Sequence, residues 1–61
     1  MDKETAIEFI QSAIALGFFG DWDRANRLVV KVQRNFRPEE YQELARKALD
    51  LGGELCQQEE Q

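Results

Sequence analysis

Apolar residues recur every three or four positions along most of the chain, which is the period of an amphipathic helix. The pattern is clearest over residues 22–36 and predicts a helix over residues 22–35. At about 100° per residue, the apolar positions other than Val30 fall within an arc of roughly 120°. They are Trp22, Ala25, Leu28, Val29, Val32 and Phe36. Opposite them lie four cationic residues, which we call the basic ridge: Arg24, Arg27, Lys31 and Arg34. One face is expected to build a core while the other meets solvent or a partner.

The segment before this helix predicts another helix, over residues 3–17, with Asp2 as its N-cap. Its apolar positions span roughly 200°, which is wider than the stripe of a surface helix. Such a helix needs burial on two sides. It lies either at the centre of its own bundle or in an interface between chains. We favour the interface, and therefore expect a homodimer formed through this first helix.

Turn signals separate the predicted helices. Gly17 or Gly20 can close the first helix in a left-handed conformation, and Asp21 can cap the second. Because this turn is short, the first two helices should pack antiparallel. Pro38 disfavours helical geometry at the preceding residue and suits the first turn of a new helix.

The third helix is expected over residues 38–56, with an apolar arc of about 160° and an acidic outer face. Residues 57–61 should form a frayed C-terminal tail. The prediction is an all-α, three-helix antiparallel bundle that makes up one small domain over residues 1–61.

The composition limits the ways in which so short a chain can be stabilised. A domain of 61 residues is near the size at which one core is barely sufficient. One cysteine cannot form an internal disulfide, and the lack of histidine removes the commonest transition-metal ligand. Oligomerisation or partner binding is the aid that remains. No basic leader or membrane-length apolar run is present, so we expect a cytoplasmic protein without membrane association.

Charge is unevenly distributed along the chain. The formal net charge of −4 divides into −2 over residues 1–20, +3 over residues 21–37 and −5 over residues 38–61. The middle helix is therefore basic and lies between two acidic segments. Overall acidity argues against a general nucleic-acid coat protein.

Groups suited to catalysis are scarce. Without histidine, no side chain has an unperturbed pKa near neutral pH. Cys56 lies on the apolar side of a predicted helix, where a buried inert thiol is expected. The carboxylates around Asp21 and Glu39 sit at helix starts, where they stabilise the helix dipole. We expect no enzyme, no cofactor and no metal site.

The first hairpin carries a recognisable spacing, Gly20-x-Trp22-x-x-Ala25. It resembles the turn and second-helix start of a tetratricopeptide repeat, with Phe9, Ala13 and Leu16 in the large, small and large positions of the first helix. The resemblance covers residues 6–38 and departs from the repeat at Ser12, Val32 and Pro38. Because such repeats bind proteins and need stacked neighbours, the resemblance implies a protein-interaction module built from one hairpin.

Two functional hypotheses follow, beside the alternative that the basic ridge is only a solvated face. The first is a regulatory adaptor, inhibitor or assembly factor that binds a protein with an acidic surface. Its expected contact residues are Phe19, Trp22, Arg24, Arg27, Val30, Lys31 and Arg34. The second is a helix-turn-helix regulator that places the basic ridge in the major groove of DNA. Asp21 and Asp23 argue against it, because base contacts are usually made from this end of the helix and carboxylates repel phosphate.

Overall fold

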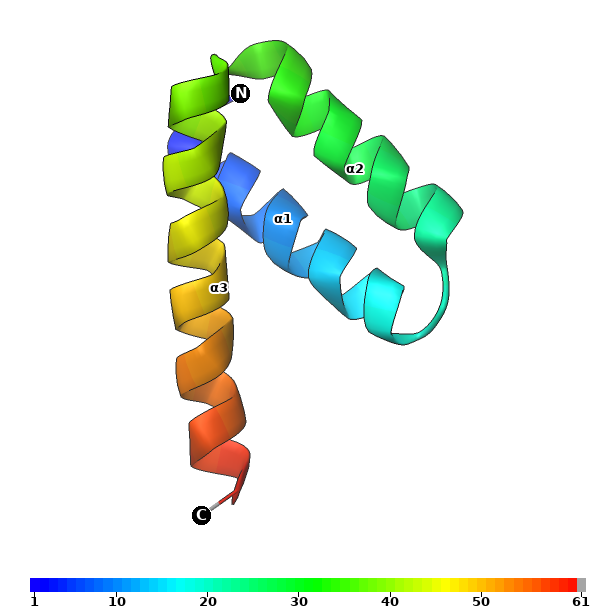
Figure 1. The fold of residues 1–61 in the computed structure, drawn as a ribbon, viewed down its shortest axis with the longest axis vertical. Helices are drawn as coiled ribbons and strands as arrows, with labels where there is room; N and C mark the ends of the chain where they lie inside the picture. The colour runs from blue at the N-terminus through cyan, green and yellow to red at the C-terminus, as the bar shows by residue number, and fades with distance from the viewer. Residues whose placement is uncertain (61) are drawn as a thin grey trace.

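The computed structural model describes the backbone of residues 1–60 and the side chains of residues 1–51. It contains three helices, α1 (Lys3–Phe18), α2 (Trp22–Asn35) and α3 (Pro38–Glu60), and the described residues form no strand. The predicted all-α three-helix architecture is therefore confirmed (Figure 1).

Helix boundaries agree closely with the sequence-based prediction for the first two helices. The third helix runs to Glu60 instead of ending near residue 56. Its backbone continues through Gly52 and Gly53, since glycine inside a helix costs only about 0.5–1 kcal/mol relative to alanine. The expected fraying of residues 57–61 and burial of the Cys56 thiol fall beyond the described side chains and stay predictions.

Both N-caps form as their sequences predict. The Thr5 N–H donates to Asp2 Oδ1 at 3.2 Å, and the Arg24 N–H donates to Asp21 Oδ1 at 3.4 Å. Hydrogen bonding to Thr5 lowers the pKa of Asp2 below its ordinary value of 3.8. Each cap satisfies an amide that the first helical turn leaves without a partner.

Gly20 closes α1 in the left-handed conformation, with φ of +85°. Its N–H donates to the Gly17 carbonyl at 3.0 Å, and the Asp21 N–H donates to the Leu16 carbonyl at 2.9 Å. These two bonds satisfy carbonyl groups at the helix end and reverse the chain. The reversal makes α1 and α2 an antiparallel hairpin (Figure 1).

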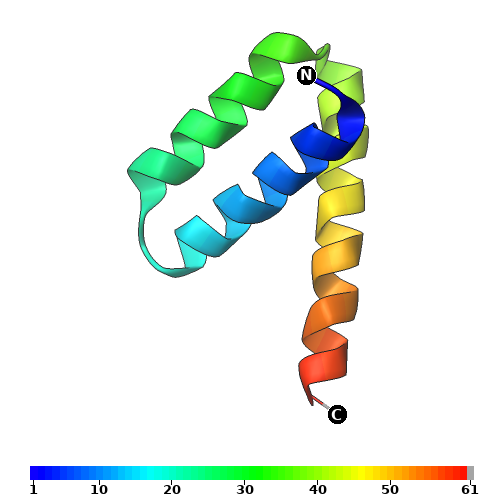
Figure 2. The same cartoon turned by 180° about the vertical axis from the view of Figure 1, so that it is seen from behind.

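Helix α1 lies between the other two helices. It packs along α2 and also against α3, whereas α2 and α3 touch each other at few residues. In both views α1 begins beside α3 and runs away from it, so the turn of the hairpin lies far from α3 (Figures 1 and 2). Of the two explanations offered for the wide apolar arc of this helix, packing on two sides within one chain is the one that the fold contains. Homodimerisation stays a prediction.

Small side chains dominate the core. The buried residues are Ala6, Ile10, Ala13, Ala25, Val32, Leu44 and Ala48. Alanines allow the helices to approach closely, while Val32 and Leu44 fill the space against Ile10. The core therefore uses only part of the apolar arcs. Trp22 and Leu49 lie on those arcs but are 65% and 60% exposed, because the divergence of α3 leaves their side of the bundle uncovered.

Replacing Val32 with alanine tests this core. Val32 is fully buried, so Val32→Ala should lower the free energy of unfolding by about 2 kcal/mol through lost burial and a residual cavity. Val30 lies on the same helix but is 41% exposed, so Val30→Ala should change the free energy of unfolding by less than about 0.5 kcal/mol. Urea denaturation followed by circular dichroism measures both. Equal effects of the two substitutions would contradict the packing of α2 described here.

Candidate functional site

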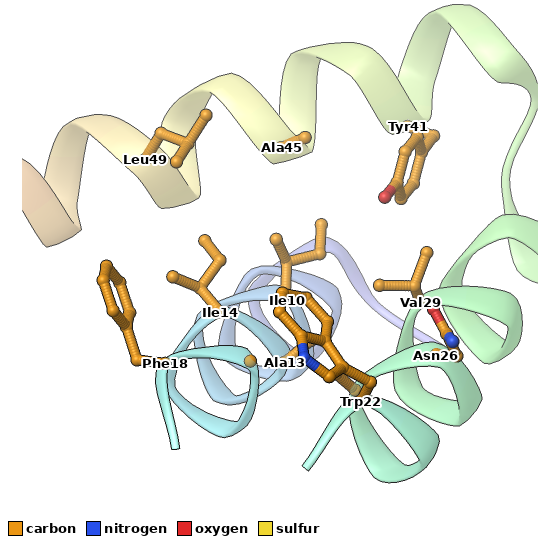
Figure 3. Close-up of a pocket in the computed structure, with 12 residues that line it drawn as sticks. Ile10, Ala13, Ile14, Phe18, Trp22, Asn26, Val29, Tyr41, Ala45 and Leu49 are labelled. Atoms are coloured by element: carbon orange, nitrogen blue, oxygen red, sulfur yellow. The ribbon is translucent and has the colours of Figure 1, made fainter. Parts of the chain in front are cut away.

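A groove opens where α2 and α3 diverge over α1. We call it the apolar groove. Its volume is about 670 Å³, and its lining residues are Ile10, Ala13, Ile14, Gly17, Phe18, Trp22, Ala25, Asn26, Val29, Tyr41, Ala45 and Leu49. Helix α1 forms the floor, and the other two helices form the walls (Figure 3). Tyr41 is drawn opposite Val29, and Leu49 opposite Phe18.

The lining of the apolar groove is almost entirely hydrocarbon. Among the described lining residues, polar side-chain atoms come from the Asn26 amide, the Tyr41 hydroxyl and the Trp22 indole N–H. Such a surface binds by desolvation and shape, because it offers few groups that could polarise or protonate a ligand. The groove therefore suits recognition of an apolar surface.

Large aromatic side chains lie around the turn of the hairpin. Phe18 and Phe19 are 87% and 89% exposed, and Trp22 is also mostly exposed. Phe18 and Trp22 line the apolar groove, whereas Phe19 does not. Burying a phenylalanine stabilises a protein by about 1.5–3 kcal/mol, which is a large share of what so small a core supplies. The chain thus leaves much of its available apolar burial unused.

Trp22 covers the turn by lying over Gly17. A Cβ atom placed on Gly17 would lie 3.1 Å from Cζ3 of the indole, closer than nine in ten observed contacts of a Cβ, so the ring would have to move by a few tenths of an ångström. Glycine therefore leaves the space that the ring occupies. The small residues Ala13 of α1 and Ala25 of α2 are buried, so these two helices approach closely under the indole.

The basic ridge is exposed along α2. Arg24 Nε lies 3.6 Å from Asp21 Oδ2, and Lys31 Nζ lies 6.0 Å from the centre of the Phe9 ring. Arg27 and Arg34 have no carboxylate within ion-pair distance among the described residues. A shallow hollow runs along this face and is lined by Asn26, Arg27, Val30, Lys31, Arg34 and Asn35. Arg27 and Arg34 are therefore available to an acidic partner.

The structure divides the predicted contact residues among three places. Trp22 belongs to the apolar groove, and Phe19 projects at the hairpin turn. The others share the exposed face of α2: Arg24, Arg27, Val30, Lys31 and Arg34. Sequence reasoning missed Phe18, Tyr41 and Leu49 as members of a common surface. The wide apolar arc of α1 was the available signal, but it does not reveal where α3 crosses.

Two further observations bear on chemistry. Across the described side chains, no group of three or more metal-ligating residues comes together. No helix in the described part of the chain combines the length and apolar character needed to cross a membrane.

Comparison with known proteins adds no relative. No family model, curated protein sequence or solved structure matches this chain. The candidate surfaces must be interpreted from their own geometry.

Two glycine substitutions should separate the packing of Trp22 from the geometry of the turn. Gly17→Ala should push the indole outward and shift Trp22 emission to longer wavelength, with a small change in stability because alanine favours the helix. Gly20→Ala should cost about 1–2 kcal/mol through its positive φ and leave Trp22 emission unchanged, since nothing lies within 4 Å of the added methyl. Fluorescence and urea denaturation distinguish the two. A spectral shift in the Gly20 variant alone would contradict this arrangement.

Proposed function

We propose that this chain is a non-catalytic protein-interaction module, which acts as a small adaptor, inhibitor or assembly factor. The observation that carries the proposal is the exposure of large apolar side chains: four of the seven buried core residues are alanine, while Phe18, Phe19 and Trp22 meet solvent. Exposed apolar clusters of this kind are typical of binding surfaces. A partner that covers them would supply burial that the isolated domain lacks.

The basic ridge supports the same proposal. Arginine and tryptophan are the residue types most enriched among those that dominate binding energy. The ridge gives one side of the molecule a positive charge, although the chain is acidic overall. This separation orients an acidic protein surface and disfavours a basic one. We therefore expect the partner to carry carboxylates opposite Arg27 and Arg34.

Self-association through α1 is a competing use of the same surface, because a second copy seated there would exclude an outside partner from it. Since α1 packs against both neighbours, the strip that faces the apolar groove is its large remaining apolar surface, at Ile14 and Phe18. The resemblance of residues 6–38 to one tetratricopeptide repeat also favours protein binding, because a repeat of that kind needs a neighbour to cover its outer face.

Charge reversal on the ridge tests the proposal. A tagged copy should retain a partner protein from nuclease-treated native extract, and Arg27→Glu with Arg34→Glu should reduce its recovery about tenfold or more. The matched control is Lys3→Glu with Lys47→Glu, which changes net charge equally but lies outside α2. Quantitative mass spectrometry measures recovery, and circular dichroism checks folding. Retention of no protein, or equal loss with both double variants, would contradict the proposal.

DNA binding is the alternative that charge alone leaves open. The ridge is exposed, but Asp21 and Asp23 occupy the end of α2 that a helix-turn-helix protein directs at base edges. We expect no retention on duplex DNA even at about 50 mM salt, where phosphate contacts are strong. A gel-shift titration checks this. Binding that weakens steeply with salt and disappears with Arg27→Glu and Arg34→Glu would overturn the protein-binding proposal in favour of a DNA-binding regulator.

A further inference from the structure

We infer that the apolar groove is the docking site for a single amphipathic α-helix of another protein, whose apolar stripe is bordered by carboxylates on the flank that faces α2. The inference rests on the proposed function and specifies the partner's shape and charge. In this arrangement the incoming helix lies over α1 between α2 and α3 and completes a four-helix bundle.

The spacing of the lining residues fits a helix. Ile10, Ile14 and Phe18 recur at every fourth position of α1, and Tyr41, Ala45 and Leu49 do so on α3. Each row spans about 12 Å, or slightly more than two helical turns. The α2 wall carries Trp22, Asn26 and Val29, which also recur at spacings of three and four. Rows of this kind accept a helix whose apolar residues occur at i, i+4 and i+7.

The backbone of the groove excludes an extended peptide as the preferred occupant. The floor and both walls are helices, whose internal amides and carbonyls bond within their own helix. No strand edge is present in the described residues, so an added strand would leave its own backbone groups without partners. A helix satisfies its backbone internally and needs from the groove only apolar contact.

Charge beside one rim selects an acidic flank. On α2, Asn26 lines the groove and also the shallow hollow that carries Arg27 and Arg34, for which the described residues provide no ion-pair partner. On α3, exposed Arg46 lies about 100° around the helix from Ala45, and Glu39, Glu43 and Asp50 lie on the same outer side. The edge of a docked helix that faces α2 would therefore meet guanidinium groups, whereas the edge that faces α3 would meet charges of both signs. Glutamate or aspartate on the flank that faces α2 complements these guanidinium groups.

A second copy of this chain does not offer such a stripe. Each of its helices already turns its apolar side toward the shared core or toward its own groove. The remaining sides of α2 and α3 that are described carry mainly charged residues. We therefore assign the occupant to another protein, with a second copy as an outcome that the experiment distinguishes.

The test is a peptide titration of the purified full chain, followed by fluorescence of Trp22, its single tryptophan, which lines the groove. The probe is a synthetic helical peptide with leucine at i, i+4, i+7 and i+11 and glutamate on one flank. Saturable binding with a shift of emission to shorter wavelength is expected. A peptide of the same composition in scrambled order, and one with lysine in place of glutamate, should each bind at least about tenfold more weakly.

Two leucine variants provide the matched control. Leu49→Glu places a charge in the groove and should weaken peptide binding at least about tenfold. Leu51 is 45% exposed and does not line the groove, so Leu51→Glu should change affinity less than about twofold. Circular dichroism establishes that both variants fold, which their exposure allows. If Leu49→Glu does not fold, Ala45→Gln takes its place.

Three results would overturn the inference: no saturable shift with folded protein, equal binding of the scrambled peptide, or equal effects of the two leucine variants. A concentration-dependent Trp22 shift of the protein alone, with dimer mass in sedimentation equilibrium and lost with Leu49→Glu, would also overturn it and assign the groove to a second copy. The proposed function fails separately. If ridge reversal abolishes capture of a partner and Leu49→Glu does not, protein binding stands and the groove inference falls.

Discussion

The contact of α1 with both neighbouring helices is the interaction on which the rest of the structure depends. Because α2 and α3 barely touch each other, each is held in place mainly through α1. That contact is made by residues such as Ala6, Ala13 and Ala48, whose small side chains let the helices approach closely. A core of this kind is thin, which leaves the stability of a 61-residue domain small and sensitive to single substitutions.

The same constraint creates the apolar groove. A bundle in which α2 and α3 packed along their whole lengths would cover Trp22 and Leu49, but these two helices touch at few residues, diverge and leave a hollow between them. The apolar side chains on the open side then cannot reach one another. Their exposure follows from the helix arrangement, and it links the weak core to a capacity for binding. Stability and recognition thus draw on the same set of apolar residues.

The exposed charges affect partner binding more than folding. Arg27 and Arg34 of the basic ridge lie on the hollow beside the groove and have no ion-pair partner among the described residues, while most of the acidic residues lie outside α2. Exposed charges of this kind contribute little to folding, since solvent screens them. They act instead on the choice and orientation of a partner, whose affinity would come from the apolar surface. The two features together support a protein-binding role.

Periodicity and turn chemistry in the sequence determined the helices: Pro38, Asp21 and Gly20 fix where they end and begin, and the four cations at spacings of three and four share one face of α2. These are local effects, so the sequence alone predicts them. Only the tertiary structure decided which apolar positions are buried, because that depends on where α3 crosses α1. The membership of Phe18, Tyr41 and Leu49 in one groove is a product of that crossing, since residues far apart in sequence meet only through the packing of helices.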